Sequence, residues 1–99
     1  MIYLDYAATS PVRREVLDAM LPYLTQQFGN ADSLHALGRQ AALALRAARD
    51  EIAAVLGVAP YEVYFTSGGT EADNWAADGI ARGADGGILV SPIEHAALL

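Results

Sequence analysis

Two residue types are missing from the sequence: it has no cysteine, and its six basic residues are all arginine, so it has no lysine. The lack of cysteine excludes disulfides, thiolate metal sites and a cysteine nucleophile within these 99 residues. The lack of lysine excludes a P-loop, in which a lysine follows the glycines. Any chemistry in this stretch therefore relies on hydroxyl, carboxylate, imidazole and backbone groups.

Positive charge and long apolar runs are also scarce. Twelve acidic residues against six arginines give a formal net charge of −6, which argues against a nucleic-acid partner. No apolar run approaches the roughly 18 residues of a membrane span, and the opening MIYLDYAATS is unlike a signal peptide. An apolar content of 54% is typical of a globular domain. We expect a soluble, cytoplasmic protein without a membrane partner.

The first half of the chain has two helical patterns. Ser10 and Pro11 form a good helix start, and Pro22 should bend or end that helix. A loop rich in Gly, Asn, Asp and Ser follows, and the spacing predicts a long helix over 33–56, capped by Asp32 or Ser33 and ended by Gly57. The apolar positions that recur at helical spacing in the two segments are Val12, Val16, Met20, Leu21 and Leu24, then Leu34, Leu37, Ala41, Leu45, Ala48, Ile52 and Val55.

The second half reads strand, helix, strand. Residues 62–66 and 87–91 are rich in β-branched and apolar side chains, residues 70–82 have helical spacing, and a further helix is expected from 92 onward. This order predicts a parallel βαβ unit. Two parallel strands do not make a self-sufficient sheet, so the chain resembles the front of a larger α/β domain. We divide it into 1–32, 33–57 and 61–99.

The turn between the first strand and its helix, FTSGGT, is the first candidate site. Gly68 and Gly69 would let a ligand approach the backbone, and the following helix start favours an anion. Ser67 and Thr70 add hydroxyl donors. The alternative is a plain connecting turn, which local chemistry alone favours over phosphate binding.

The two histidines are weaker candidates. His95 follows the second strand and would lie at the same sheet edge as the glycine turn, where an imidazole could stack on a flat ring or move a proton. Taken alone, a surface histidine at a helix start is the more common interpretation. His35 has no second ligand at helical spacing, so no metal site is predicted.

Four stretches together indicate a family: YLDYAATSPV, FGNADSLHALGR, VYFTSGGTEADN and SPIEHAALL. In this order they resemble the amino-terminal part of the NifS- and IscS-like cysteine desulfurases, which belong to the class V aminotransferase family. The resemblance covers essentially the whole chain. It implies part of the fold-type-I large domain of pyridoxal phosphate enzymes, with helices, a parallel βαβ unit and an incomplete sheet, in a homodimer.

The resemblance also implies site residues. Gly69 and Thr70 would hold the phosphate of pyridoxal 5'-phosphate. His95 would stack on the cofactor ring and act as a catalytic residue in proton transfer. The substrate entrance or dimer contact would include Ala8, Thr9, Asn30 and His35.

Members of the family convert L-cysteine to L-alanine and pass the sulfur as a persulfide to iron–sulfur scaffolds or thiolation acceptors. The cofactor-binding lysine, the aspartate on the pyridine nitrogen and the sulfur-accepting cysteine lie beyond Leu99 in the family, so these 99 residues alone are expected to be inactive. Two alternatives stay open. One is another class V enzyme, such as a selenocysteine lyase; the other is a non-catalytic, truncated or oligomerising α/β chain.

Overall fold

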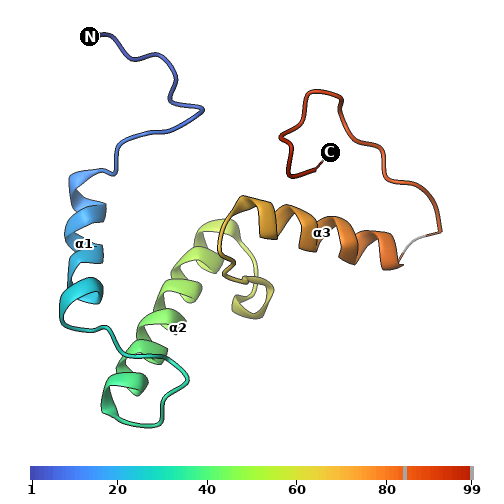
Figure 1. Ribbon diagram of the computed structural model, residues 1–99. Coiled ribbons are helices and arrows are strands. Elements are labelled where there is room, and N and C mark those ends of the chain that lie inside the picture. Colours follow the sequence, from blue (N-terminus) through green and yellow to red (C-terminus); the bar gives the residue numbers. More distant parts are fainter. Residues whose placement is uncertain (84, 99) are drawn as a thin grey trace. The chain divides into compact units, whose positions relative to one another are not determined.

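The computed structural model describes residues 1–83 and 85–98. Its elements are α1 (Arg14–Thr25), α2 (Ala36–Leu56), the short 3₁₀ helix η1 (Pro60–Glu62) and α3 (Gly69–Gly83) (Figure 1). The chain divides into two compact units, Met1–Pro60 and Tyr61–Leu99. The first unit contains α1 and α2, and the second contains α3.

Helix α1 starts later than the sequence predicts. Its N-cap is Arg13, whose side chain makes no capping hydrogen bond, so the predicted cap at Ser10 is wrong. An ion pair between Arg14 and Asp18, with Nε 3.0 Å from Oδ1, spans the first turn and supports the observed start. Pro22 lies inside α1, and the amides of Gln26 and Gln27 both donate to its carbonyl at 2.8 Å, which ends the helix.

Helix α2 ends as predicted but is capped by a different residue. Asp32 and Ser33 are not its cap because their amides bond to the Oδ1 and carbonyl of Asn30, each at 3.0 Å, in a preceding turn. His35 is the N-cap, and its Nδ1 accepts from the amide of Gly38 at 3.3 Å. At the other end Gly57 adopts φ 70°, the left-handed conformation that favours glycine at this position.

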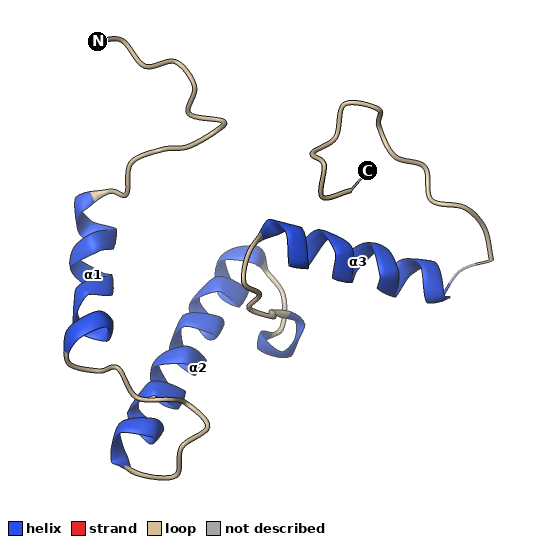
Figure 2. Cartoon of the chain, viewed as in Figure 1, coloured by secondary structure: helices blue, strands red, loops and turns tan. Residues whose placement is uncertain are grey.

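The predicted strands are absent from the part of the chain that the structure describes, which contains only helices and loops (Figure 2). Residues 63–66 and 87–91 are irregular, so the parallel βαβ unit is not confirmed. An isolated strand leaves its backbone groups unpaired, and a single pair is marginal without neighbouring strands. The helix between them is confirmed, because α3 matches the predicted 70–82 to within a residue at each end.

The segment after the second predicted strand is also not helical. Residues 92–98 form turns, with the amide of Glu94 donating to the carbonyl of Ser91 and the amide of Leu98 to that of His95. Residue 99, which belongs to this prediction, lies outside the described residues.

Little of the apolar surface is covered within the described residues. Ala53 on α2, at 1% exposure, is the one apolar side chain buried there, while Val55 and Leu56 in the same helix stay exposed. Exposed apolar area of this kind is typical of surfaces that pack against other protein. Among the described helices, none combines the length and the apolar character needed to span a bilayer.

Candidate functional site

The candidate site is the glycine turn at the start of α3. The amide of Ala72 donates to the carbonyl of Gly68 at 3.1 Å, which makes Gly68 the residue that precedes the helix. The hydroxyl of Thr66 donates to the same carbonyl at 3.0 Å. The amides of Gly69 and Thr70 fall in the first turn, where backbone N–H groups have no partner within the helix. These are the donors that could hold an anion.

The carboxylate of Glu71, in the first turn of α3, accepts hydrogen bonds from the glycine turn. Its Oε2 accepts from the amide of Ser67 at 2.7 Å and from the Ser67 hydroxyl at 2.5 Å. The hydroxyl hydrogen bond, followed by the amide hydrogen bond, lowers the pKa of Glu71 below its usual value. Both Ser67 donors are therefore used by Glu71, whereas the sequence suggested that Ser67 would offer its hydroxyl to a ligand.

The two glycines of the turn are open to their surroundings. Neither Gly68 nor Gly69 has a positive φ, and a Cβ added to either would meet no atom within 4 Å. Gly38 in α2 is different because a Cβ there would collide with the carbonyl of Ser33. Within the described residues, neither the backbone conformation nor the packing requires glycine at 68 and 69. The open backbone is what close approach of a ligand needs.

His95 lies at the start of an exposed turn. Its carbonyl accepts from the amide of Leu98 at 2.9 Å, and its Nδ1 accepts from the amide of Ala97 at 3.1 Å. A ring nitrogen that accepts a hydrogen bond carries no proton, so the neutral ring has its proton on Nε2. The sequence prediction of an exposed imidazole at the start of a new element agrees with this geometry, although the element is a turn.

Asn74 connects the turn of His95 to the start of α3. Its Nδ2 donates to the carbonyl of Thr70 at 2.8 Å and to the carbonyl of Ala97 at 2.9 Å. The structure thus brings the segment of Thr70 and the segment of His95 together. Sequence reasoning missed Asn74. Its i+4 spacing places it on the face of Thr70, but no pattern indicates its bond to a residue 23 positions away.

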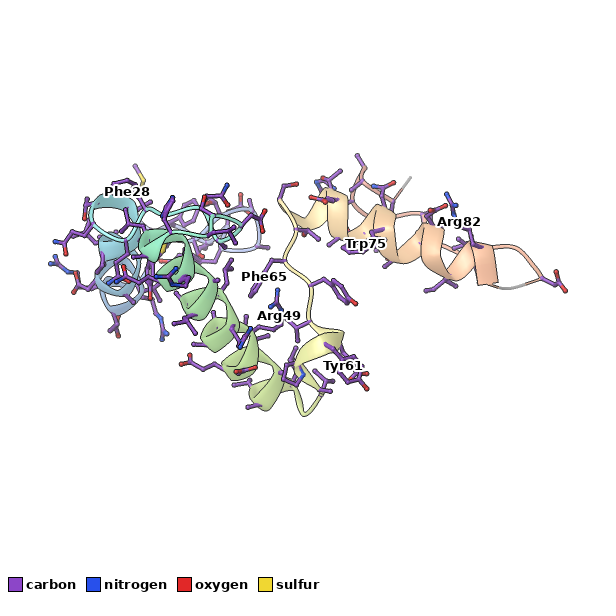
Figure 3. The ribbon with its side chains drawn as sticks, turned by 90° about the horizontal axis from the view of Figure 1, so that it is seen from below. Phe28, Arg49, Tyr61, Phe65, Trp75 and Arg82 are labelled. Atoms are coloured by element: carbon purple, nitrogen blue, oxygen red, sulfur yellow. The ribbon has the colours of Figure 1, made fainter. Side chains whose placement is uncertain are left out.

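Tyr64 and Trp75 form an edge-to-face pair in the same unit. Their ring centroids are 5.4 Å apart with an interplanar angle of 70°, and Trp75 projects from α3 (Figure 3). Both rings are largely exposed, with Tyr64 at 67% and Trp75 at 53%. The contact joins the segment before α3 to the helix itself, but it does not form a buried core.

The predicted entrance residues belong to the first unit. The amides of Ala8 and Thr9 both donate to the carbonyl of Asp5, which makes a tight turn. The side chains of Asn30 and His35 bond to the backbone just before α2 and in its first turn. These local bonds shape the segment, and a role at a substrate entrance stays a prediction.

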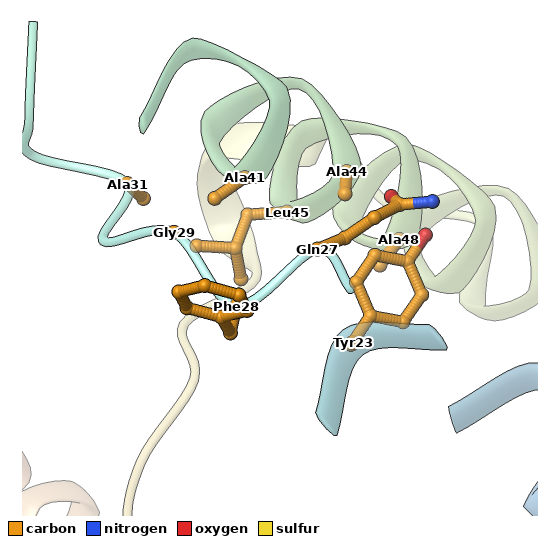
Figure 4. A pocket seen from close by; sticks show the side chains of 9 residues that line it. All are labelled: Tyr23, Gln27, Phe28, Gly29, Ala31, Ala41, Ala44, Leu45 and Ala48. Carbon is orange, nitrogen blue, oxygen red and sulfur yellow. The ribbon is translucent and has the colours of Figure 1, made fainter. Parts of the chain in front are cut away.

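An apolar groove of about 470 Å³ lies beside α2 in the first unit (Figure 4). Tyr23 is the one ionisable residue among those that line the groove. The groove is therefore not suited to acid–base chemistry. Among the described residues there is no cluster of three or more metal-ligating side chains. The residues that line the groove are Tyr23, Gln27, Phe28, Gly29, Ala31, Ala41, Ala44, Leu45 and Ala48.

Comparison with known proteins identifies relatives along the whole chain. It is 50% identical to the cysteine desulfurase IscS of Methanosarcina thermophila, over 99% of this chain and 25% of that protein. It is 46% identical to IscS of Dictyoglomus turgidum and 50% identical to a cysteine desulfurase of Rhodobacter capsulatus, in each case over 99% of this chain and 26% of the relative. The chain therefore spans about a quarter of the length of the curated relatives it matches. No solved structure gave a significant match.

A sequence profile described as "Aminotransferase class-V" matches residues 2–99. That match includes the glycine turn, Asn74 and His95, together with both helices of the first unit. The chain belongs to the class V aminotransferase family.

Proposed function

We propose that this chain is part of a pyridoxal-phosphate-dependent cysteine desulfurase, which converts L-cysteine to L-alanine and transfers the sulfur as a persulfide. The observation that carries the proposal is the connection, through Asn74, between the open start of α3 and the turn of His95. The similarity to cysteine desulfurases along 99% of the chain supports the choice of reaction.

The residues present fit the cofactor's phosphate. The first-turn amides of Gly69 and Thr70 and the Thr70 hydroxyl would hold it, and the open glycine backbone leaves room for it. His95 would contact the ring and hold or move a proton at Nε2. When bound, pyridoxal phosphate supplies an electron sink for the substrate's reacting carbon. Ala8, Thr9, Asn30 and His35 keep their proposed place near the substrate entrance.

The remaining parts of the site would come from outside these 99 residues, because the chain has no lysine to bind the cofactor covalently and no cysteine to accept sulfur. In the complete enzyme we expect residues 62–66 and 87–91 to pair with further strands in a fold-type-I α/β domain. The proposed partners are a second subunit in a homodimer and a sulfur acceptor such as an iron–sulfur scaffold. A cytoplasmic location stays a prediction.

A chimera tests this function directly. Residues 1–99 would replace the matching quarter of the Methanosarcina thermophila relative, and alanine and sulfide production from L-cysteine would be measured. We expect an active chimera whose activity falls in the His95→Ala and Thr70→Val variants. The matched control is Thr25→Val, because the Thr25 hydroxyl donates to the carbonyl of Leu21 in its own helix. A chimera that binds cofactor but does not release sulfur would contradict the proposal.

The isolated chain provides the complementary test. With no lysine it should give no turnover of L-cysteine, and measurable alanine production by the pure chain would contradict the assignment of the lysine to another part of the enzyme.

A second candidate function follows from the exposed apolar side chains, such as Leu43 at 62% and Val55 at 87% exposure. These favour a chain that associates with itself or another protein without catalysis. Sedimentation measurements across a concentration series would support this alternative if a defined oligomer formed and the chimera stayed inactive.

A further inference from the structure

Asn74 makes two hydrogen bonds that join distant parts of the second unit. Its Nδ2 donates to Thr70 O at 2.8 Å, one turn earlier in α3, and to Ala97 O at 2.9 Å. A side-chain amide nitrogen carries two hydrogens, so both bonds form at once and use its full donor capacity. Both distances are ordinary for N–H···O bonds.

Ala97 is held from two directions as a result. Its carbonyl accepts from Asn74, and its amide donates to Nδ1 of His95 at 3.1 Å. The amide of Leu98 closes the same turn by donating to the carbonyl of His95 at 2.9 Å. A continuous path of hydrogen bonds therefore runs from Thr70 through Asn74 and Ala97 to the ring of His95.

We propose that Asn74 is a positioning residue that fixes the turn of His95 against the start of α3 and thereby keeps the neutral imidazole protonated at Nε2. The inference rests on the proposed function, in which His95 contacts the cofactor ring and holds or moves a proton at Nε2. Asn74 itself would touch neither substrate nor cofactor. It acts through Ala97, whose amide is the donor that occupies Nδ1.

Nuclear magnetic resonance on the full 99-residue chain tests the inference without relying on activity. In the parent chain, the two ring ¹⁵N signals of His95 at alkaline pH should be well separated, because a single tautomer dominates. In Asn74→Ala the signals should converge toward an average, and exchange of the Ala97 and Leu98 amides should rise roughly three- to tenfold. Alanine has a higher helix propensity than asparagine, so the helical content of α3 should not fall.

The chain offers two matched controls. Asn30→Ala removes another exposed asparagine with a side-chain-to-backbone bond, and it should leave His95 unchanged. His35 also accepts a backbone amide at Nδ1 and should keep its ring signals in Asn74→Ala. Asn74→Asp keeps the size of the side chain but removes both donors, so it should change the His95 signals and the amide exchange as Asn74→Ala does. If Asn74→Ala loses helical signal, the result for Asn74→Asp is the one that tests the inference.

Unchanged His95 signals and amide exchange in both Asn74 variants would overturn the inference. Equal changes at His35 would also overturn it, because they would indicate general loosening. The outcome is separable from that of the proposed function. A chimera without desulfurase activity would refute the function while the coupling of Asn74 to His95 could still be measured.

Discussion

Helices α2 and α3 begin in different ways, although both starts lie in loops rich in small polar residues. At the start of α2, the neutral ring of His35 accepts the amide of Gly38, and Gly38 is buried. At the start of α3, the carboxylate of Glu71 accepts both donors of Ser67, and the glycine turn is exposed. The start of α2 is therefore packed against other residues. The start of α3 is exposed to solvent and carries the charged carboxylate of Glu71.

The two helix starts differ in whether their packing requires a glycine. Gly38 is required because any side chain there would strike the backbone of Ser33. Among the described residues, Gly69 has no such neighbour, and this openness agrees with its proposed role in holding a ligand. The same reasoning favours the start of α3, and not that of α2, for the proposed anion site.

The largest expected effect comes from filling the closed start. Gly38→Ala should destabilise α2 by about 1–3 kcal/mol, because the added Cβ forces the backbone away from Ser33. Gly69→Ala is the matched control and should leave the free energy of unfolding unchanged or slightly raised. Urea unfolding followed by circular dichroism measures both. Equal destabilisation by the two variants would remove the contrast between the helix starts.

Replacing the cap of α2 should have a smaller effect. His35→Ala removes the acceptor for the Gly38 amide and should cost about 1 kcal/mol of helix stability. His35→Asn keeps a side-chain acceptor at the N-cap and should restore most of the loss. Thermal unfolding by circular dichroism is the measurement. A His35→Asn variant as unstable as His35→Ala would show that the ring contributes by packing and not by capping.

The sequence was informative where local chemistry decides the structure. Gly57 ends α2 because a left-handed residue is needed there, and α3 follows from the spacing of its side chains after the glycine turn. The cap of α2 was predicted wrongly because Asn30 binds Asp32 and Ser33 in a turn of its own. Asp32, Ser33 and His35 can each act as a helix N-cap, and the backbone geometry decides which of them does.

Features that depend on distant partners could not be predicted. The strands expected at 62–66 and 87–91 need neighbours to pair with, and the described residues provide none. Asn74 was overlooked because its second bond reaches Ala97, 23 residues away. Local chemistry singled out Gly69, Thr70 and His95 as candidates, and the resemblance implied their roles. The connection of Thr70 to the turn of His95 through the side-chain amide of Asn74 is information that only the structure contains.

Removing the charge at the open start should sharpen its contrast with α2. Glu71→Gln removes a negative charge from the start of α3. The affinity of this helix start for inorganic phosphate should therefore rise roughly two- to fivefold. Shifts of the Gly69 and Thr70 amides during phosphate titration measure this affinity. Glu51→Gln on α2 removes one charge elsewhere and is the control for net charge. An equal gain in both variants would indicate a nonspecific charge effect.

The smallest expected effect is a pH dependence of the α3 start. The hydroxyl hydrogen bond from Ser67, then its amide hydrogen bond, lowers the pKa of Glu71 in the folded chain. Its contribution to stability is therefore complete above the carboxyl's unfolded value, about 4.3, and is lost as the pH falls through the lower folded value. A ¹³C titration of the Glu71 carboxyl should show this. Ser67→Ala should raise that pKa part of the way back, because the amide bond remains, whereas Ser33→Ala should not change it. If Glu71 titrates identically in Ser67→Ala and in the parent chain, the hydroxyl of Ser67 does not hold the carboxylate at the start of α3.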